Sequence, residues 1–387
     1  PAALSTATTP REAPTWPTQR MPSLVAAPQG TAPLPAAPRA NEGPAVRVRT
    51  RLIDRLLNQA GEVMTSRLRM DNNVNSLRQS LSDLSGNLER LRQQLRELDL
   101  QAELQMLRDQ AQGPWNVNFF CHTPPQVDDA AEARWRQALQ PFYAEAGIDP
   151  TSVPAGAGRV PFSHAVADVV EPFAPPVVSF HFGLPTPDLL ARVKSWGSKV
   201  LSSATTVQEA LWLEAHGVDA VIAQGLEAGG HRGMFLSSDL STQLGTLALL
   251  PQVVAAVKVP VIAAGGIANA AGVRAAMALG AAGVQVGTAY LCCPEATTSV
   301  LHRAALMSDA AQHTALTTLF SGRPARGIVN RLMRELGPLS PAAPAFPLAT
   351  AAVAPLRAHF EALGRTDCTP LWSGQNASGC QAIPAGE

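Results

Sequence analysis

Three apolar segments of the chain each run directly into a glycine-rich turn. Residues 218–223 precede a loop that ends Gly-Gly-His at residues 229–231, and residues 259–266 and 283–288 repeat the arrangement of an apolar run followed by glycine. A strand that delivers bare backbone and an imidazole at its carboxyl end is typical of an active-site wall in an α/β protein. The pattern therefore predicts an α/β barrel that holds a phosphorylated cofactor.

Strands alternate with helices from about residue 107 onward, and this alternation predicts a parallel sheet. Six strands are recognisable, whereas a closed (β/α)₈ barrel needs eight, so the other two would belong upstream of residue 115. We therefore predict an α/β fold over residues 107–387: a TIM-type barrel, incomplete at six βα units, whose open sheet edges favour aggregation. The predicted strands are 115–121, 177–183, 199–204, 220–224, 259–264 and 283–291, and the predicted helices are 128–145, 206–216, 241–257, 269–279 and one that starts near 187.

The first hundred residues contain two further compositional zones. Residues 1–45 are rich in proline, alanine, serine and threonine, which predicts a flexible linker. In residues 46–106, nine apolar residues recur at alternating steps of four and three. A stripe this narrow needs a partner helix, so we predict a coiled coil or a helical hairpin in which residues 52–57 fold back, with a role in homodimer formation. The nine residues are Met70, Val74, Leu77, Leu81, Leu84, Leu88, Leu91, Leu95 and Leu98.

The composition limits the choice of partners and compartment. Thirty basic residues balance thirty acidic ones, so nothing in the net charge favours nucleic acid or an anionic membrane. No apolar run is long enough to span a bilayer, and no signal peptide is visible. Five cysteines without a CxxC pair indicate neither a disulfide framework nor a zinc site, and we place neighbouring Cys292 and Cys293 on one strand, facing opposite sides. These features predict a cytoplasmic protein without a metal.

Two histidines stand out as candidates for chemistry. His231 ends the Gly-Gly-His loop, where the glycines let a ligand approach the backbone, and His181 interrupts an apolar strand. Such an imidazole can take a proton from a carbon acid, or stabilise an anion when protonated. For His181 a core histidine is an equal alternative. Asn118, within an aromatic strand, is either a core amide bonded to nearby backbone or a ligand contact. The other six histidines are predicted to be surface or packing residues.

Glycines close the last two predicted strands, at residues 263–267 and 285–289. Such turns expose backbone N–H groups and cradle phosphate, and in barrels the phosphate site follows strands seven and eight. No GxGxxG unit follows a strand, and neither a GxSxG elbow nor an HExxH motif occurs. These absences argue against a Rossmann domain, a serine hydrolase and a zinc protease.

Taken together, these loops resemble the nitronate monooxygenase family, formerly called 2-nitropropane dioxygenases, from about residue 104 to the C-terminus. The motifs that carry the resemblance are PWNVNFFCH (114–122), VVSFHFGLP (177–185), QGLEAGGHRG (224–233), VIAAGGIA (261–268), GVQVGTAYL (283–291), FSGRPARG (320–327) and PLWSGQ (370–375). The resemblance implies a TIM-type barrel, one non-covalent FMN, and oxidation of alkyl nitronates or nitroalkanes by O2 to a carbonyl compound and nitrite.

The resemblance also implies roles for individual residues. His231 would be the catalytic residue beside the flavin, and His181 would line the same pocket. The residues that match the family's FMN contacts are Asn118, Gln224, Gly229, Gly266, Gln285, Gly287 and Thr288. The family's opening strand, with its Pro-Met-Ala-Gly-like turn, has no counterpart here. Instead, residues 46–103 resemble the dimerisation helices of chemotaxis-type histidine kinases, which implies association only, because no histidine precedes His122.

Two alternative functions stay open on the sequence. A flavin-dependent NADH:quinone or enoyl reductase would share the barrel and its phosphate loops. A non-enzymatic chain, in which the helical segment only dimerises and the barrel is inactive, would follow from the six-of-eight strand count.

Overall fold

The structure is a computed structural model that describes residues 50–126, 128–153 and 159–386. The chain divides into two compact units, residues 1–83 and 84–387. The predicted linker at residues 1–45 lies outside the described residues. In the described part of the first unit, the chain forms the beginning of helix α1 (Thr50–Gln110).

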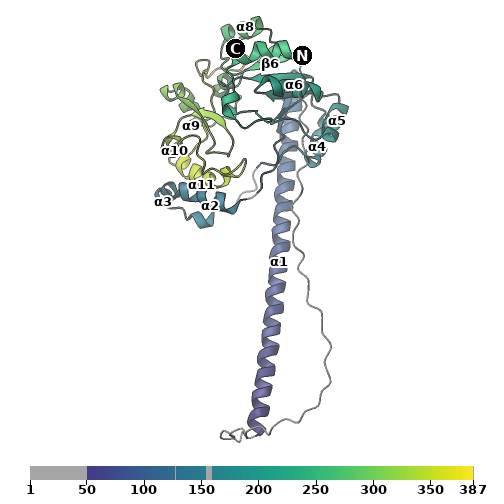
Figure 1. Ribbon diagram of the computed structural model, residues 1–387, viewed down its shortest axis with the longest axis vertical. Helices are drawn as coiled ribbons and strands as arrows, with labels where there is room; N and C mark the ends of the chain where they lie inside the picture. The colour runs from purple at the N-terminus through teal and green to yellow at the C-terminus, as the bar shows by residue number, and fades with distance from the viewer. Residues whose placement is uncertain (1–49, 127, 154–158, 387) are drawn as a thin grey trace, which may run out of the picture. The chain divides into compact units, whose positions relative to one another are not determined.

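The second unit is built on a parallel sheet curled as half of a barrel (Figure 1). Its six strands lie in the order β1-β2-β3-β4-β6-β7, and every neighbouring pair is parallel. The prediction of six βα units is therefore confirmed, and β1 and β7 are the edges of the sheet among the described residues. The strands are β1 (Asn116–Phe120), β2 (Val177–His181), β3 (Lys199–Ala204), β4 (Ala220–Gln224), β6 (Val261–Ala264) and β7 (Gly283–Gln285).

Helices follow the strands and pack on the sheet. Thr206 and Asn269 cap α6 and α8 by accepting hydrogen bonds from backbone amides of the first turn, as short polar side chains do at helix starts. Buried apolar residues of sheet and helices, such as Val178, Phe180 and Leu213, form one continuous core. The helices are α4 (His164–Val170), α5 (Pro187–Ser195), α6 (Val207–Ala215), α7 (Thr246–Ala256) and α8 (Ala270–Ala278), with the short 3₁₀ helices η2 (Glu171–Phe173) and η3 (Leu240–Thr242) between them.

A second apolar core lies beside the half-barrel, and the sequence did not predict it. Trp135 and Tyr143 are fully buried in it, and each donates a hydrogen bond to a carbonyl of α11, on Ala349 and Ala352 respectively. An antiparallel sheet, ordered β5-β9-β8, adjoins this core. The remaining elements of this unit, apart from η4, are α2 (Asp129–Ala138), α3 (Gln140–Ala146), η1 (Pro150–Ser152), β5 (Gly230–His231), α9 (Val300–Leu306), η5 (Asp309–Gln312), β8 (Thr314–Thr317), β9 (Ala325–Ile328), α10 (Arg331–Leu336) and α11 (Ala349–Ala362).

Several predicted boundaries are corrected. The strand predicted at residues 283–291 ends at Gln285, and the 3₁₀ helix η4 (Thr288–Cys292) follows. Cys292 and Cys293 therefore do not lie on a strand, and both are buried. The helix predicted at 128–145 is interrupted at Leu139, before the proline that begins α3. The helix predicted from residue 241 begins at Thr246.

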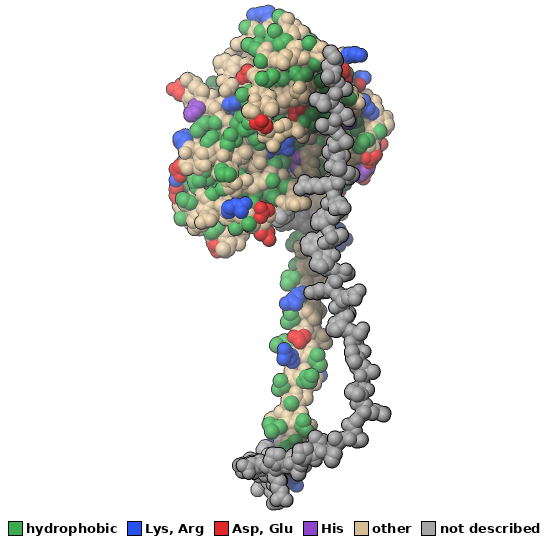
Figure 2. All heavy atoms as spheres, viewed as in Figure 1, with side chains coloured by type: hydrophobic (Ala, Val, Ile, Leu, Met, Phe, Trp, Pro, Cys, Tyr) green, Lys and Arg blue, Asp and Glu red, His purple; other side chains and the backbone are tan. Residues whose placement is uncertain are grey.

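Helix α1 runs without a break from Thr50 to Gln110. The predicted hairpin is therefore wrong, because residues 52–57 continue the helix instead of folding back. Figure 2 shows apolar side chains repeated along α1. The nine residues of the predicted stripe are each 40–65% exposed, so the coiled coil stays a prediction. Near its end, α1 joins the core of the second unit through Leu104, which is 1% exposed. No helix in the described ranges combines the length and hydropathy of a membrane crossing.

Candidate active site

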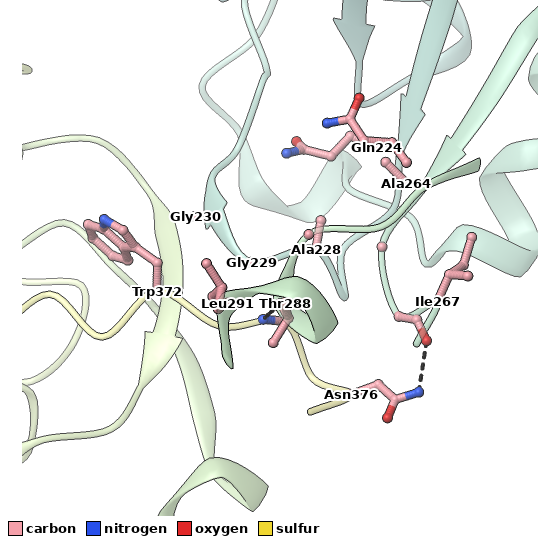
Figure 3. Close-up of a pocket in the computed structure, with 15 residues that line it drawn as sticks. Gln224, Ala228, Gly229, Gly230, Ala264, Ile267, Thr288, Leu291, Trp372 and Asn376 are labelled. Carbon is pink, nitrogen blue, oxygen red and sulfur yellow. Dashed lines mark hydrogen bonds between the residues drawn. The ribbon is translucent and has the colours of Figure 1, made fainter. Parts of the chain in front are cut away.

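Two adjoining cavities open at the carboxyl ends of the parallel strands. We call the first the glycine pocket. It has a volume of about 240 Å³, and backbone from three glycine-rich turns forms much of its wall. Figure 3 shows that the C-terminal segment with Trp372 and Asn376 also contributes. Its lining residues are Gln224, Ala228, Gly229, Gly230, Ala264, Gly265, Gly266, Ile267, Gln285, Gly287, Thr288, Leu291, Trp372, Gly374 and Asn376.

The second cavity, which we call the histidine pocket, has a volume of about 230 Å³. It shares Gln224, Gly229, Ala264 and Gln285 with the glycine pocket, so the two form one extended hollow across the strand ends. Its lining residues are Asn116, Asn118, Phe120, Ser179, His181, Ser203, Ile222, Gln224, Gly229, His231, Ala264 and Gln285.

All nine residues predicted for the site lie in this hollow. His231, His181 and Asn118 line the histidine pocket. Gly266, Gly287 and Thr288 line the glycine pocket, and the remaining three, Gln224, Gly229 and Gln285, line both. The structure thus brings the predicted residues together, while their roles toward a ligand stay predictions.

The two histidines are held by defined partners. His231 Nε2 lies 2.8 Å from Ser321 Oγ, and the Ser321 hydroxyl lies 3.4 Å from the carbonyl oxygen of Arg323, to which it can donate. His181 Nδ1 lies 3.1 Å from Ser203 Oγ, and His181 Nε2 lies 3.1 Å from the carbonyl oxygen of His231. A carbonyl only accepts, so His181 Nε2 carries a proton and its Nδ1 accepts from Ser203. His181 is therefore fixed as one neutral tautomer that supports the loop of His231.

Burial keeps both imidazoles neutral. It lowers the pKa of His231 to about 3 and that of His181 to about 4, and nearby positive charge acts in the same direction. For both rings this charge includes Arg323, whose guanidinium carbon lies 3.9 Å from the centre of the Phe182 ring. That phenyl ring in turn contacts both histidine rings. Neutral His231 keeps a lone pair at neutral pH, beside a permanent cation.

Stability is expected to fall on acidification because of these histidines. Once unfolded, each imidazole regains its ordinary pKa of 6.5, so unfolding takes up protons as the pH drops below that value toward the folded pKa. The free energy of unfolding at pH 5 should therefore be lower than at pH 7 by up to about 2 kcal/mol per histidine. Urea unfolding at the two pH values checks it. His181→Gln should reduce this difference, and His313→Gln, at an exposed histidine outside both pockets, should preserve it. Equal stability at both pH values would refute the argument.

The loop between β4 and β5 is organised by a buried arginine. Arg232 is 0% exposed and donates to the carbonyl oxygens of Gly225 (2.6 Å) and Gln224 (2.8 Å) and twice to Gln243 Oε1 (3.0 and 2.9 Å). The side chain of Gln224 completes the loop, because it donates to the carbonyl of His231 and accepts from the amide of Gly233. These bonds set the position from which His231 faces the pocket.

Replacement of Arg232 by lysine is expected to destabilise the protein by about 3 kcal/mol. Lysine keeps the positive charge but lacks the planar guanidinium group with its several N–H donors. The buried carbonyl oxygens and the Gln243 amide oxygen therefore lose hydrogen bonds. The midpoint of urea unfolding measures this change. Arg274→Lys, in α8 and outside both pockets, is the matched control. A variant as stable as the parent would show that the Arg232 guanidinium does not stabilise the loop between β4 and β5.

The C-terminal segment closes the glycine pocket. The Gly374 amide donates to Thr288 Oγ1 at 2.9 Å, and Asn376 Nδ2 donates to the Gly266 carbonyl at 2.9 Å, as the dashed lines in Figure 3 show. A Cβ on Gly229 would come within 2.5 Å of the Gly374 nitrogen, so only glycine permits this close approach. Trp372, Gly374 and Asn376 were not among the predicted site residues. The PLWSGQ motif (370–375), which contains the first two and directly precedes Asn376, was the signal that could have found them.

Two other predictions are refined by the structure, and one further residue is added to the site. Asn118 is not a core amide: it is exposed, and its Oδ1 accepts from Ser179 Oγ at 2.9 Å. Its NH₂ group donates to no described residue, so it can serve a ligand. His122, which we expected at the surface or in packing, is buried, with its ring 4.8 Å from that of Phe346 in the aromatic group around His231. Ser321 is the partner of His231, and its role could not be read from the sequence.

The model of the family described as nitronate monooxygenase matches residues 96–387. The chain belongs to the nitronate monooxygenase family. Members of this family are oxidoreductases, so the predicted resemblance and the enzyme class are confirmed. The match begins at residue 96, and the likeness of residues 46–103 to histidine kinase helices stays a prediction.

Individual relatives agree with this assignment. The nitronate monooxygenase of Pseudomonas aeruginosa is 42% identical over 279 residues, which cover 71% of this chain and 79% of the relative. That of Paraburkholderia phytofirmans is 42% identical over 281 residues, 71% of this chain and 75% of the relative. Among solved structures, nitroalkane oxidase from Streptomyces ansochromogenes shares 39% identity with a TM-score of 0.67, covering 74% of this chain and 81% of its own. FabK from Thermotoga maritima shares 26% identity with a TM-score of 0.53, covering 74% and 77%.

Proposed function

We propose that this enzyme oxidises alkyl nitronates with O2 to a carbonyl compound and nitrite, with FMN bound across the glycine and histidine pockets. The observation that carries the proposal is their continuity: a glycine-lined end suited to phosphate is joined to an end that holds two neutral histidines. Their combined volume lies in the range of small-molecule sites.

The glycine pocket fits a phosphate group. No aspartate or glutamate lines it. The amides of Gly266 and Gly287 donate no hydrogen bond to any described residue, so both can serve an anion. A Cβ on Gly287 would meet nothing within 4 Å, so the space beside it is available to a ligand. Backbone N–H groups in glycine-rich turns are common phosphate donors.

The histidine pocket fits the ring of a flavin. Asn118 and Gln285 are exposed there, and their amide groups can bond the polar edge of a ring. The Phe120 ring, which lines the same pocket, supplies an apolar surface. When bound, FMN would supply a ring that accepts electrons from the substrate carbon.

The chain's own residues would bind the substrate and move its proton. Arg323 and Arg159 place positive charge beside the pocket, through contacts of their guanidinium groups with the Phe182 and Phe120 rings, and this charge favours an anionic nitronate. For a neutral nitroalkane, His231 would take the proton from the carbon next to the nitro group, because its low pKa leaves the ring unprotonated. Ser321 would orient that ring through its bond to Nε2.

Nitrite release tests the proposal. The purified chain is expected to carry FMN and, with propyl-2-nitronate, to consume O2 and release nitrite. His231→Asn should retain the flavin and lose most turnover of a neutral nitroalkane, which separates catalysis from cofactor binding. A chain that takes up no FMN from solution would instead favour the non-enzymatic alternative.

The reductase alternative is tested in the same preparation. The fold shared with FabK extends over 74% of this chain, so the scaffold is not restricted to nitronate monooxygenases. Sustained NADH oxidation with a quinone or an enoyl thioester, without nitrite from propyl-2-nitronate, would select the reductase. We place the reaction in the cytoplasm, a reducing compartment that suits five free cysteines.

A further inference from the structure

We infer that α1 pairs with α1 of a second copy of this chain through one apolar face, which we call the leucine seam. Its members follow a heptad spacing of alternating three and four residues, the period of a helix that packs along another helix. The seam consists of Met70, Val74, Leu77, Leu81, Leu84, Leu88, Leu91, Leu95 and Leu98. This inference concerns assembly and does not depend on the proposed reaction.

No described residue of the chain buries the leucine seam. Its nine residues are 40–65% exposed, although every one is apolar. A continuous apolar strip of this length is rare on a monomer and marks an interaction surface. An isolated helix also gains little stability from propensity alone, because most helical stability comes from packing of an apolar face. The strip therefore requires a partner.

The core of the second unit does not cover the end of the seam. Leu100 and Leu104 pack into its core, whereas Leu95 and Leu98 remain 59% and 61% exposed. At about 100° of rotation per residue, Leu100 lies roughly 200° from Leu98 around the helix, so the two sets occupy opposite faces. The last turns of α1 thus pack on the core of the second unit with one face and leave Leu95 and Leu98 directed away from it.

Outside α1, the described residues provide no matching helix. Among the other described helices the longest is α11, with 14 residues, and it is already packed in the second core. Residues 1–49, whose sequence contains ten prolines, lie outside the described residues. A helix with the same heptad period and length is available in a second copy of α1.

The charges beside the seam permit this pairing. In the heptad frame with Leu81 at position a and Leu84 at d, one flank is occupied by Asn73, Ser80, Asn87 and Gln94, all uncharged. The opposite flank carries charges of both signs, including Asp71 and Arg78. In a parallel, in-register pair these two flanks face each other, so no like charges are brought together.

The solution mass of the full chain tests the inference. Light scattering after size-exclusion chromatography should give twice the chain mass of 40.6 kDa. Leu88→Asp/Leu95→Asp places charge in the seam and should halve that mass. The control Ser76→Asp/Ser82→Asp adds the same charge to exposed positions outside the seam and should leave the dimer intact.

Two further measurements make the result decisive. Circular dichroism shows whether the seam variant keeps the folded second unit, and its FMN content and nitrite release should be unchanged, since no seam residue lines either pocket. A monomeric parent chain, any mass other than twice that of the chain, or a dimer that survives the seam variant would overturn the inference. The last result would point to the open edges of the sheet instead.

Discussion

Replacement of His231 by asparagine is expected to slow the oxidation of a neutral nitroalkane by about 10²- to 10³-fold, the usual contribution of a positioned base. Turnover of the pre-formed nitronate should fall much less, because that substrate has already lost its proton. Initial rates of nitrite release with nitroethane and with its nitronate, at matched flavin content, measure the two effects.

The pH dependence of nitroalkane oxidation is a second test of the role of His231. Burial holds the pKa of His231 at about 3, so the base is unprotonated throughout the neutral range and its titration should leave no step in activity near pH 6.5. Ser321→Ala removes the partner at Nε2 and should produce a smaller loss that also concentrates on the neutral substrate. An equal loss on both substrates would show that His231 has another role.

Replacement of Gly287 by valine is expected to weaken FMN binding by about 10- to 100-fold while leaving the fold intact. A Cβ at this position would meet no protein atom within 4 Å, and Gly287 lines the glycine pocket, where added bulk would compete with the cofactor. The fluorescence of FMN released on heating measures the bound fraction, and thermal unfolding of the apoprotein measures stability.

Two further glycine variants serve as controls for the effect of Gly287→Val on FMN binding. Gly113→Val adds the same side chain in open space outside the pockets and should bind FMN normally. Gly229→Val should instead damage both stability and binding, because its Cβ would come within 2.6 Å of backbone atoms of Ser373 and Gly374. If Gly287→Val kept full flavin content, the phosphate would not lie beside Gly287.

Buried parallel strands were the most predictable part of this fold. The bounds of β3 and β4 were predicted to the residue because turn-forming residues delimit both runs. β3 ends just before Thr206, which caps α6, and β4 runs into the loop that begins at Gly225. Since the carboxyl ends of neighbouring parallel strands meet, the loops after these strands could also be placed together. The nine individual site residues were chosen from those loops through the resemblance to the family.

Contacts between distant segments were not predictable. Ser321 reaches His231 across 90 positions, and no local spacing records such a pair. The small sheet β5-β9-β8 was missed because its strands have two to four residues, too few to show a period. The strand predicted through residue 291 failed for a related reason: alternating apolar residues continue past Gln285, but the backbone turns at Gly287 into η4.

The last turns of α1 carry the end of the seam on one face and Leu100 and Leu104 on the other. An insertion between these two sets would therefore rotate the seam about the helix axis relative to the face that packs on the second unit. One extra residue after Leu98 would swing the seam by about 100° and bring part of it round toward the enzyme's own surface. Seven extra residues would alter the direction by only about 20° and add about 10 Å of length. In the proposed dimer, the number of residues in this short stretch, and not only their identity, would therefore set which side of the second unit faces the partner copy.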